Sequence, residues 1–148
     1  MRNTILSAAG ALILDEAGRV LLVEPNYKDY WEIPGGLIEV GETPSQGCER
    51  EIAEELGLTR TPGRLLVVDW APHPTHGDRV LFVFDGGVLT TAEIAEIRLQ
   101  PTELDSYEFL PPARALDRLV PRLRCRVDAA LRARTEGSTL YLEHGIRY

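Results

Sequence analysis

The chain has 148 residues, of which 44% are hydrophobic and 26% are charged, so we expect one globular domain over residues 1–148. The formal net charge of −7 argues against general nucleic-acid binding, because such proteins usually present a basic face. Two cysteines predict no disulfide framework, and no stretch is long enough to span a membrane. The apolar run near the N-terminus is too short and too weakly basic to favour a signal peptide, so we expect a cytoplasmic protein.

The order of apolar runs and turn residues predicts a mixed α/β fold. The expected strands, in chain order, are residues 4–14, 19–24, 31–33, 65–70, 79–84, 88–89, 94–99 and 107–110, with a further one at 139–144. The expected helices are residues 44–56, 112–120 and 121–134, with Pro121 marking the break between the last two. Residues 15–18 and 85–87 contain glycine and predict turns.

The loop at residues 25–30 is polar and precedes the sequence WEIPGG. Its Tyr27, Lys28 and Tyr30 could contact a substrate, although such side chains more often form plain loop surface. We expect Trp31 to pack in the core rather than to stack on a substrate.

The helix at residues 44–56 has clear start and stop signals. Thr43 can cap the free amides of the first turn, Pro44 suits the first helical position, and Gln46 completes a capping-box pattern. Gly57 is the natural stop, because a left-handed residue costs little there. At about 100° per residue, an apolar stripe that includes Cys48 forms the core face of this helix.

Three acids, Glu51, Glu54 and Glu55, lie on the sector next to that stripe. Their mutual repulsion costs roughly 0.2–0.5 kcal/mol per close pair on an exposed helix. A hard divalent cation converts this cost into binding, because Mg²⁺ and Mn²⁺ prefer carboxylate oxygens at short range. Taken alone, the stretch REIAEE would more often be a solvated helix face. The preceding glycine pair changes this, since glycine lets the backbone approach a cation and offers its carbonyl as a ligand.

The stretch from Gly36 to Leu58 resembles the Nudix box, G-x5-E-x7-R-E-U-x-E-E-x-G-U, where U is aliphatic. All nine specified positions are filled, by Gly36, Glu42, Arg50, Glu51, Ile52, Glu54, Glu55, Gly57 and Leu58. From average residue usage, a chance match at one start point is on the order of 10⁻⁹. The resemblance implies the Nudix fold, an α/β/α sandwich around a central mixed β-sheet.

The resemblance also implies a hydrolase that uses Mg²⁺, with Mn²⁺ as a substitute. Water attacks one phosphorus of a nucleoside diphosphate derivative, and the bound cation makes that water more acidic. By position, Glu54 and Glu55 correspond to the main metal ligands. Glu51 corresponds to a further ligand or to the base, and Gly36 to a ligand through its carbonyl oxygen. Arg50, together with Glu42, corresponds to an orienting residue at the catalytic site.

Other residues outside the box are candidates for the site. Glu103 lies where Nudix proteins often supply one more acid, so we expect it to be a metal ligand or the base, with Asp105 and Glu108 as rivals. His73 and His76 share one loop, but two histidines without a third ligand make a weak metal site. Pro74 resembles, only weakly, a marker of ADP-ribose-cleaving Nudix enzymes. Arg64, Arg79 and Arg98 could meet a phosphate or simply face solvent.

The expected substrate is a small nucleotide, either a nucleoside diphosphate derivative such as ADP-ribose or a nucleotide sugar, or a nucleoside triphosphate. One alternative is a nucleotide-binding sensor that keeps the fold without turnover, which the complete set of box acids disfavours. Another is a prenyl diphosphate isomerase, which needs a cysteine in the cleft, whereas Cys48 is predicted to face the core. A homodimer is a further expectation, because Nudix proteins often pair.

Overall fold

The computed structural model describes residues 1–73, 75, 77–144 and 146–147, and within them eight strands form one mixed sheet. The strands are Leu6–Asp15 (β1), Val20–Pro25 (β2), Gly35–Leu37 (β3), Leu65–Trp70 (β4), Arg79–Leu89 (β5), Leu104–Leu110 (β6), Leu140–Glu143 (β7) and Ile146–Arg147 (β8). The helices in the same residues are Pro44–Leu56 (α1), Thr91–Ala95 (α2), Pro112–Arg118 (α3) and Pro121–Glu136 (α4). The α/β fold with a mixed sheet is confirmed.

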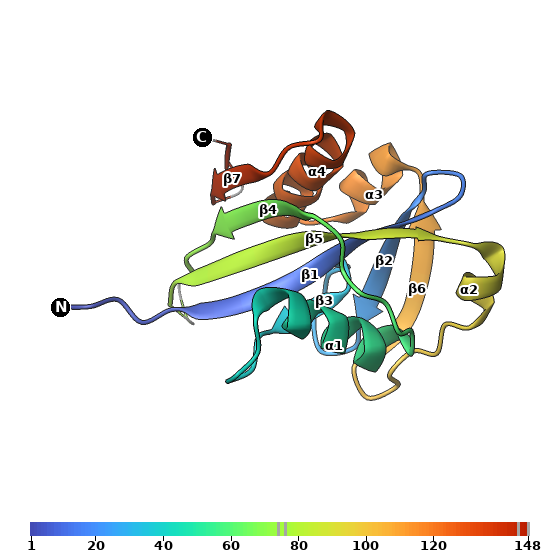
Figure 1. Ribbon diagram of the computed structural model, residues 1–148, viewed down its shortest axis with the longest axis horizontal. Coiled ribbons are helices and arrows are strands. Elements are labelled where there is room, and N and C mark those ends of the chain that lie inside the picture. The colour runs from blue at the N-terminus through green and yellow to red at the C-terminus, as the bar shows by residue number, and fades with distance from the viewer. Residues whose placement is uncertain (74, 76, 145, 148) are drawn as a thin grey trace.

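Strand β1 is the centre of the sheet (Figure 1). It pairs in parallel with β5 along its whole length, and on its other side it pairs antiparallel with β2 and β3. The order across the sheet is β6-β2-β1-β5-β4-β7-β8, with β3 attached to β1 outside this path. Because β3 and β2 share one side of β1, the loop between them is held beside the middle of the sheet.

Helices cover both faces of the sheet, with α1 on one face and α3 and α4 on the other (Figure 1). The alternation of side chains along each strand divides the core into two clusters. In β1, for example, Leu12 and Leu14 pack toward α4, whereas Ala11 and Ile13 pack toward Ile52 of α1. The sheet therefore acts as a platform that presents α1 on one face.

The expected strand at residues 94–99 is wrong, because helix α2 begins at Thr91 and includes Ile94. Thr90 caps this helix: its hydroxyl accepts from the Glu93 N–H at 3.2 Å, and the Glu93 carboxylate accepts from the Thr90 N–H at 3.0 Å. The sequence contains the capping pattern T-x-x-E at residues 90–93, a helix-start signal that the expected strand does not take into account.

Two other expected boundaries are also wrong. Residues 31–33 form no strand of their own, and only Glu32 bridges to Val23, while strand β3 begins later at the glycine pair. Residues 85–87 are not a turn at the end of a strand, because β5 continues through them to Leu89 with an irregularity in its pairing to β1. Glycine-rich strands of this kind depend on close approach to a neighbouring strand, which propensity does not reveal.

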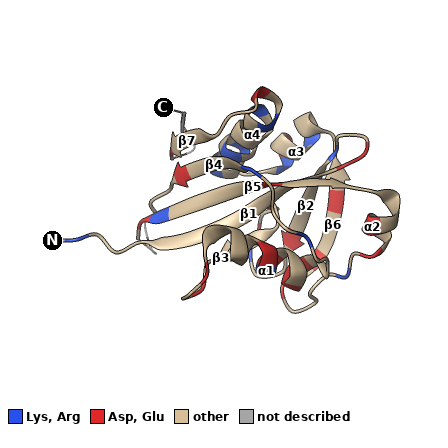
Figure 2. Ribbon diagram, in the orientation of Figure 1, with Lys and Arg blue, Asp and Glu red and all other residues tan. Residues whose placement is uncertain are grey.

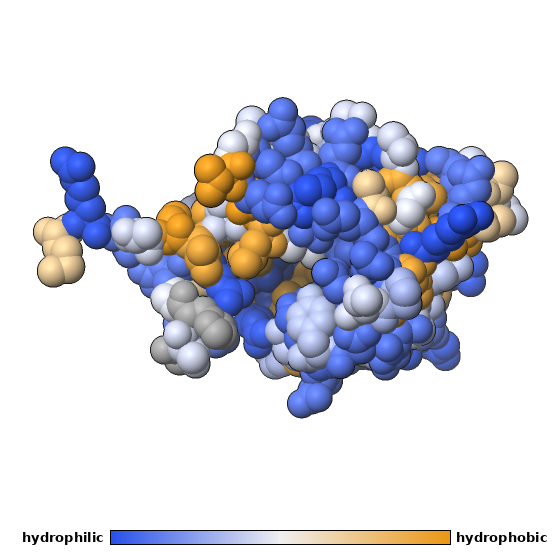
Figure 3. Space-filling view, turned by 90° about the horizontal axis from the view of Figure 1, so that it is seen from below, coloured by the Kyte–Doolittle hydropathy of each residue, from blue (hydrophilic) through white to orange (hydrophobic). Residues whose placement is uncertain are grey.

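Acidic residues are concentrated on α1, whereas α3 and α4 carry more basic than acidic residues (Figure 2). The face seen in Figure 3 is mainly hydrophilic, with apolar surface both toward the N-terminal end and at the opposite end. Large exposed apolar side chains in the described residues include Leu6, Leu37 and Val40. Among those residues, no helix is both long enough and apolar enough to cross a membrane.

Candidate active site on helix α1

Helix α1 begins and ends at the predicted residues, and its caps are formed as predicted. The Thr43 hydroxyl accepts from the Gln46 N–H at 3.2 Å, and the Gln46 side chain accepts from the Thr43 N–H at 2.9 Å. Gly57 adopts a left-handed conformation, with φ of 69°, at the C-terminal end. Cys48, Ile52 and Leu56 are fully buried, so the predicted core face is confirmed. This orientation turns the acids of α1 toward the glycine pair of β3.

The glycine pair lies directly against two of these acids. The Gly35 N–H donates to the Glu55 carboxylate at 2.7 Å. At Gly36, an added Cβ atom would meet all three carboxylate atoms of Glu51 at 2.5–2.8 Å. The Glu51 carboxylate therefore occupies space that exists only because residue 36 has no side chain.

Burial and like charge raise the pKa values of both acids. Glu55 is only 2% exposed, and burial, reinforced by the charges of Glu51, Glu32 and Glu103, raises its pKa to about 8 despite the bond from Gly35. Burial also raises the pKa of Glu51, with Glu54 and Glu103 adding to the effect, although Arg50 opposes it. Several acidic side chains thus lie close together where α1 meets β3, and Arg50 offsets only part of their negative charge.

Arg50 is the cation that holds these carboxylates in place. Its Nε and Nη2 atoms donate to Glu42 at 2.7 and 3.0 Å, and Nη2 also donates to the Leu37 carbonyl at 2.9 Å. Its Nη1 atom donates to Glu51 at 3.0 Å and to Glu54 at 3.1 Å. The bonds to Glu42 and Glu51 raise the pKa of Arg50 well above its ordinary value, so the guanidinium stays charged. Arg50 therefore contacts Glu42, Glu51 and Glu54 at once, and its orienting role stays a prediction.

The charges of two further acids affect Glu55, and one of these acids was not among the predicted site residues. Glu103, at the loop before β6, and Glu32, in the sequence WEIPGG, both act electrostatically on Glu55. We call Glu32, Glu51, Glu54, Glu55 and Glu103 the acid cluster. The position of Glu32 just before the glycine pair could have indicated its role, but the sequence does not show which way a loop side chain points.

The donor chemistry of the acid cluster fits a hard divalent cation. Glu51 and Glu55 are packed against a glycine backbone, and burial and neighbouring negative charge raise the pKa values of both, so a hard cation would stabilise their ionised forms. In the described residues, no three His, Cys, Asp or Glu side chains already converge at metal-ligand spacing. Arg50 accounts for part of this, because its Nη1 atom holds the oxygens of Glu51 and Glu54. Among the three α1 acids of the acid cluster, Glu54 is the most exposed, with 48% of its side chain accessible to solvent.

Several other candidates lie apart from the acid cluster. The Arg64 guanidinium donates to the carbonyls of Ala133 and Ser138, so it caps the C-terminal end of α4 and is not directed toward the acid cluster. His73 closes a short loop, exchanging backbone hydrogen bonds with Gly77. Pro74 and His76 lie outside the described residues.

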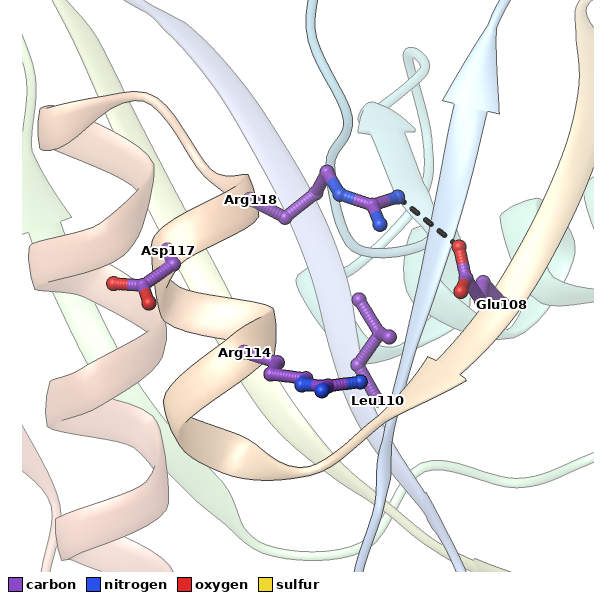
Figure 4. Close-up of a pocket in the computed structure, with 5 residues that line it drawn as sticks. All are labelled: Glu108, Leu110, Arg114, Asp117 and Arg118. Carbon is purple, nitrogen blue, oxygen red and sulfur yellow. Dashed lines mark hydrogen bonds and ion pairs between the residues drawn. The ribbon is translucent and has the colours of Figure 1, made fainter.

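Trp31 packs against the core on the α4 side, as predicted. The Arg118 guanidinium lies 4.9 Å from the centre of its ring and donates to Glu108 at 3.0 Å. Arg118 and Glu108 line a hollow of about 420 Å³ between β6 and α3, shown in Figure 4. No member of the acid cluster lines this hollow. Glu108 is therefore engaged with Arg118, away from the acid cluster.

Cys48 lies on the buried side of α1 and faces the core, as predicted. Burial, with help from Glu51 and Glu49, raises the pKa of its thiol to about 12. A thiol of this kind stays protonated and out of reach of a substrate, which removes the main requirement of the isomerase alternative.

A family model described as NUDIX domain matches residues 4–129, so the chain belongs to the Nudix family. Among solved structures, the MutT protein of Methanosarcina mazei Go1 is similar, with a TM-score of 0.75 and 26% sequence identity. That similarity covers 93% of this chain and 98% of the other. The α/β/α arrangement and the box residues on α1 are thus those of an established family.

Curated relatives are similar over shorter stretches. The chain is 40% identical over 50 residues to the putative ADP-ribose pyrophosphatase YjhB of Bacillus subtilis, covering 34% of this chain and 24% of that protein. It is 32% identical over 125 residues to the 8-oxo-dGDP phosphatase NUDT18 of Homo sapiens, covering 79% of this chain and 38% of that protein. The chain spans less than half the length of the curated relatives that it matches.

Proposed function

We propose that this protein is a divalent-metal-dependent hydrolase that cleaves the diphosphate linkage of a nucleoside diphosphate derivative or a nucleoside triphosphate. The observation that carries the proposal is the packing of Glu51 and Glu55 against Gly36 and Gly35, beside Glu54 of the same helix. Relatives named as pyrophosphatases and phosphatases of nucleotides support the substrate class.

In this proposal, Glu51, Glu54, Glu55 and the Gly36 carbonyl hold Mg²⁺ or Mn²⁺, with Glu103 as a further ligand. The bound cation would supply an acidified water and would neutralise charge on the bridging phosphates. Arg50 keeps the carboxylates aligned through its bonds to Glu42 and Glu51. Glu51 or Glu103 takes the proton of the attacking water, since the environment of Glu51 raises its affinity for a proton.

A substrate panel tests the proposal. ADP-ribose, nucleotide sugars, dinucleotides and normal and oxidised nucleoside triphosphates are incubated with the protein in Mg²⁺ or Mn²⁺, and phosphate release is measured with and without added phosphatase. We expect the protein to cleave one substrate class far faster than the others. For that class, we expect Glu54→Gln to lower the rate of cleavage by about 100-fold or more. Glu49→Gln, on the same helix but outside the acid cluster, is the matched control. Wild-type turnover by Glu54→Gln would contradict the assignment of Glu54.

Two further expectations stay predictions. The first is a homodimer, which size-exclusion chromatography with light scattering would test. The second is a cytoplasmic location, which fractionation of the source cells would test.

A further inference from the structure

Lys28 is the only lysine in the chain, and it lies in the loop between β2 and β3. Its Nζ atom is 3.1 and 3.4 Å from the two carboxylate oxygens of Glu32, a member of the acid cluster. The same atom lies 5.3 Å from the centre of the Tyr27 ring and 5.5 Å from that of Tyr30. The ammonium group is thus held between two aromatic rings and one carboxylate, while 32% of its side chain stays exposed.

The loop that carries Lys28 is fixed to the acid cluster at both ends. At one end, the Asn26 N–H donates to the Glu103 carbonyl at 2.9 Å. At the other end, Glu32 exchanges two backbone hydrogen bonds with Val23, at 2.8 and 3.0 Å. Burial raises the pKa of Tyr27, and the charges of Glu32, Glu55 and Glu103 add to this effect, whereas the charge of Lys28 opposes it.

Lys28 has an N–H donor that is not used in contacts to Glu32, whereas every N–H donor of Arg50 is matched by an acceptor. Arg50 directs five hydrogen bonds to carboxylate and carbonyl oxygens, which matches its five N–H groups. Arg50 could meet a phosphate only by releasing one of these oxygens. An ammonium group has three N–H donors, and the two contacts to Glu32 leave at least one of them for another acceptor.

We propose that Lys28 binds a non-bridging phosphate oxygen of the substrate, with Glu32 as the positioning residue that aims its ammonium group. This inference rests on the proposed hydrolysis of a diphosphate linkage at the acid cluster. A lysine ammonium is a compact point charge and is well suited to phosphate. It offsets negative charge that the bound cation leaves on the diphosphate, and the two tyrosine rings restrict its rotation.

The test measures metal binding and diphosphate binding separately. Mn²⁺ affinity is measured by electron paramagnetic resonance, and affinity for the Mn²⁺ complex of methylenediphosphonate, which is not hydrolysed, is measured by calorimetry. For Lys28→Met we expect unchanged Mn²⁺ affinity and a loss of about 10- to 100-fold in methylenediphosphonate affinity, as for a lost charge-assisted hydrogen bond. Lys28→Arg retains most of that affinity because it keeps the charge. Arg132→Met, which removes an exposed cation of α4 paired with Asp128, is the control and changes neither value.

Equal methylenediphosphonate affinity in Lys28→Met and wild type, or no binding of this probe by the wild type, would overturn the role of Lys28. The proposed function fails in a different way. Mn²⁺ affinity that is the same in Glu54→Gln and wild type would argue against the metal site itself. Loss of Mn²⁺ binding in Glu54→Gln would support the metal site, whatever the result for Lys28.

Discussion

At the scale of single residues, the Glu51 carboxylate leaves no room for a side chain at Gly36. An added Cβ at residue 36 would meet Glu51 Oε1 at 2.5 Å, but the end of a glutamate side chain can move away at small cost. We therefore expect Gly36→Ala to unfold at nearly the wild-type temperature and to bind Mn²⁺ about 10-fold or more weakly, because its carboxylate is displaced. Thermal unfolding checks the expected stability of Gly36→Ala, and Mn²⁺ titration checks its expected loss of affinity. Unchanged Mn²⁺ affinity would refute the expected displacement of the Glu51 carboxylate.

Glu55 should make the stability of the metal-free protein depend on pH. Its carboxyl loses a proton near 4.5 when exposed and near 8 when folded, because burial raises its pKa. Between these values the folded state holds a proton that the unfolded state has lost, so the free energy of unfolding falls as pH rises, by at most about 1.4 kcal/mol per pH unit. Glu55→Gln keeps the acceptor for the Gly35 N–H but does not titrate.

Urea unfolding in EDTA at about pH 5 and about pH 7.5 measures this effect. We expect Glu55→Gln to lose less stability than the wild type between the two pH values, since other groups titrate equally in both proteins. Parallel behaviour of the two proteins would show that Glu55 ionises in the fold as it does in water. Addition of Mg²⁺ at the higher pH should restore stability to the wild type in particular, because the cation favours the ionised carboxylate.

At the scale of elements, helix α1 was predictable and its surroundings were less so. Local signals set its limits: Thr43 and Gln46 at one end and Gly57 at the other form the expected caps. Strand β3 has no such signal, because Gly35 lies there through close approach to β1, where an added Cβ would meet the Ala9 carbonyl at 2.5 Å. Glu32 was missed for the same reason, since its place in the acid cluster depends on how β3 and β2 attach to β1.

The two capping boxes of the chain allow a matched test of how local caps stabilise the fold. Thr43→Ala removes the acceptor for the Gln46 N–H at the start of the 13-residue helix α1, which should lower the free energy of unfolding by about 1 kcal/mol. Thr90→Ala removes the same contact from α2, which has five residues and no buried ones, so we expect a smaller loss. Urea unfolding of both variants gives the comparison. An equal or larger loss for Thr90→Ala would contradict the view that α1 matters more to the core.

At the scale of the whole molecule, α4 is tied to the sheet on the face opposite α1 by a buried ion pair. Arg126 Nε donates to Asp69 Oδ2 at 2.8 Å, and both side chains are almost completely removed from solvent. Loss of one partner would leave a buried charge without its main compensation, which typically costs about 3–5 kcal/mol, whereas replacement of both by apolar groups of similar size is often neutral. The pair thus joins two layers of the fold, and its effect on stability depends on whether one partner or both are replaced.

We therefore expect Asp69→Leu and Arg126→Met each to lower the free energy of unfolding by about 3–5 kcal/mol, and the double variant to recover most of that loss. Urea unfolding of the four proteins forms a double-mutant cycle, and additive losses would show that the two charges are stabilised independently. Because the pair lies on the α4 side and the acid cluster is built from α1 and the loops beside β3, the double variant should keep the Mn²⁺ affinity of the wild type. Such a result would show that metal binding on the α1 face of the sheet does not depend on the ion pair on the α4 face. It would also show that apolar side chains can replace that ion pair.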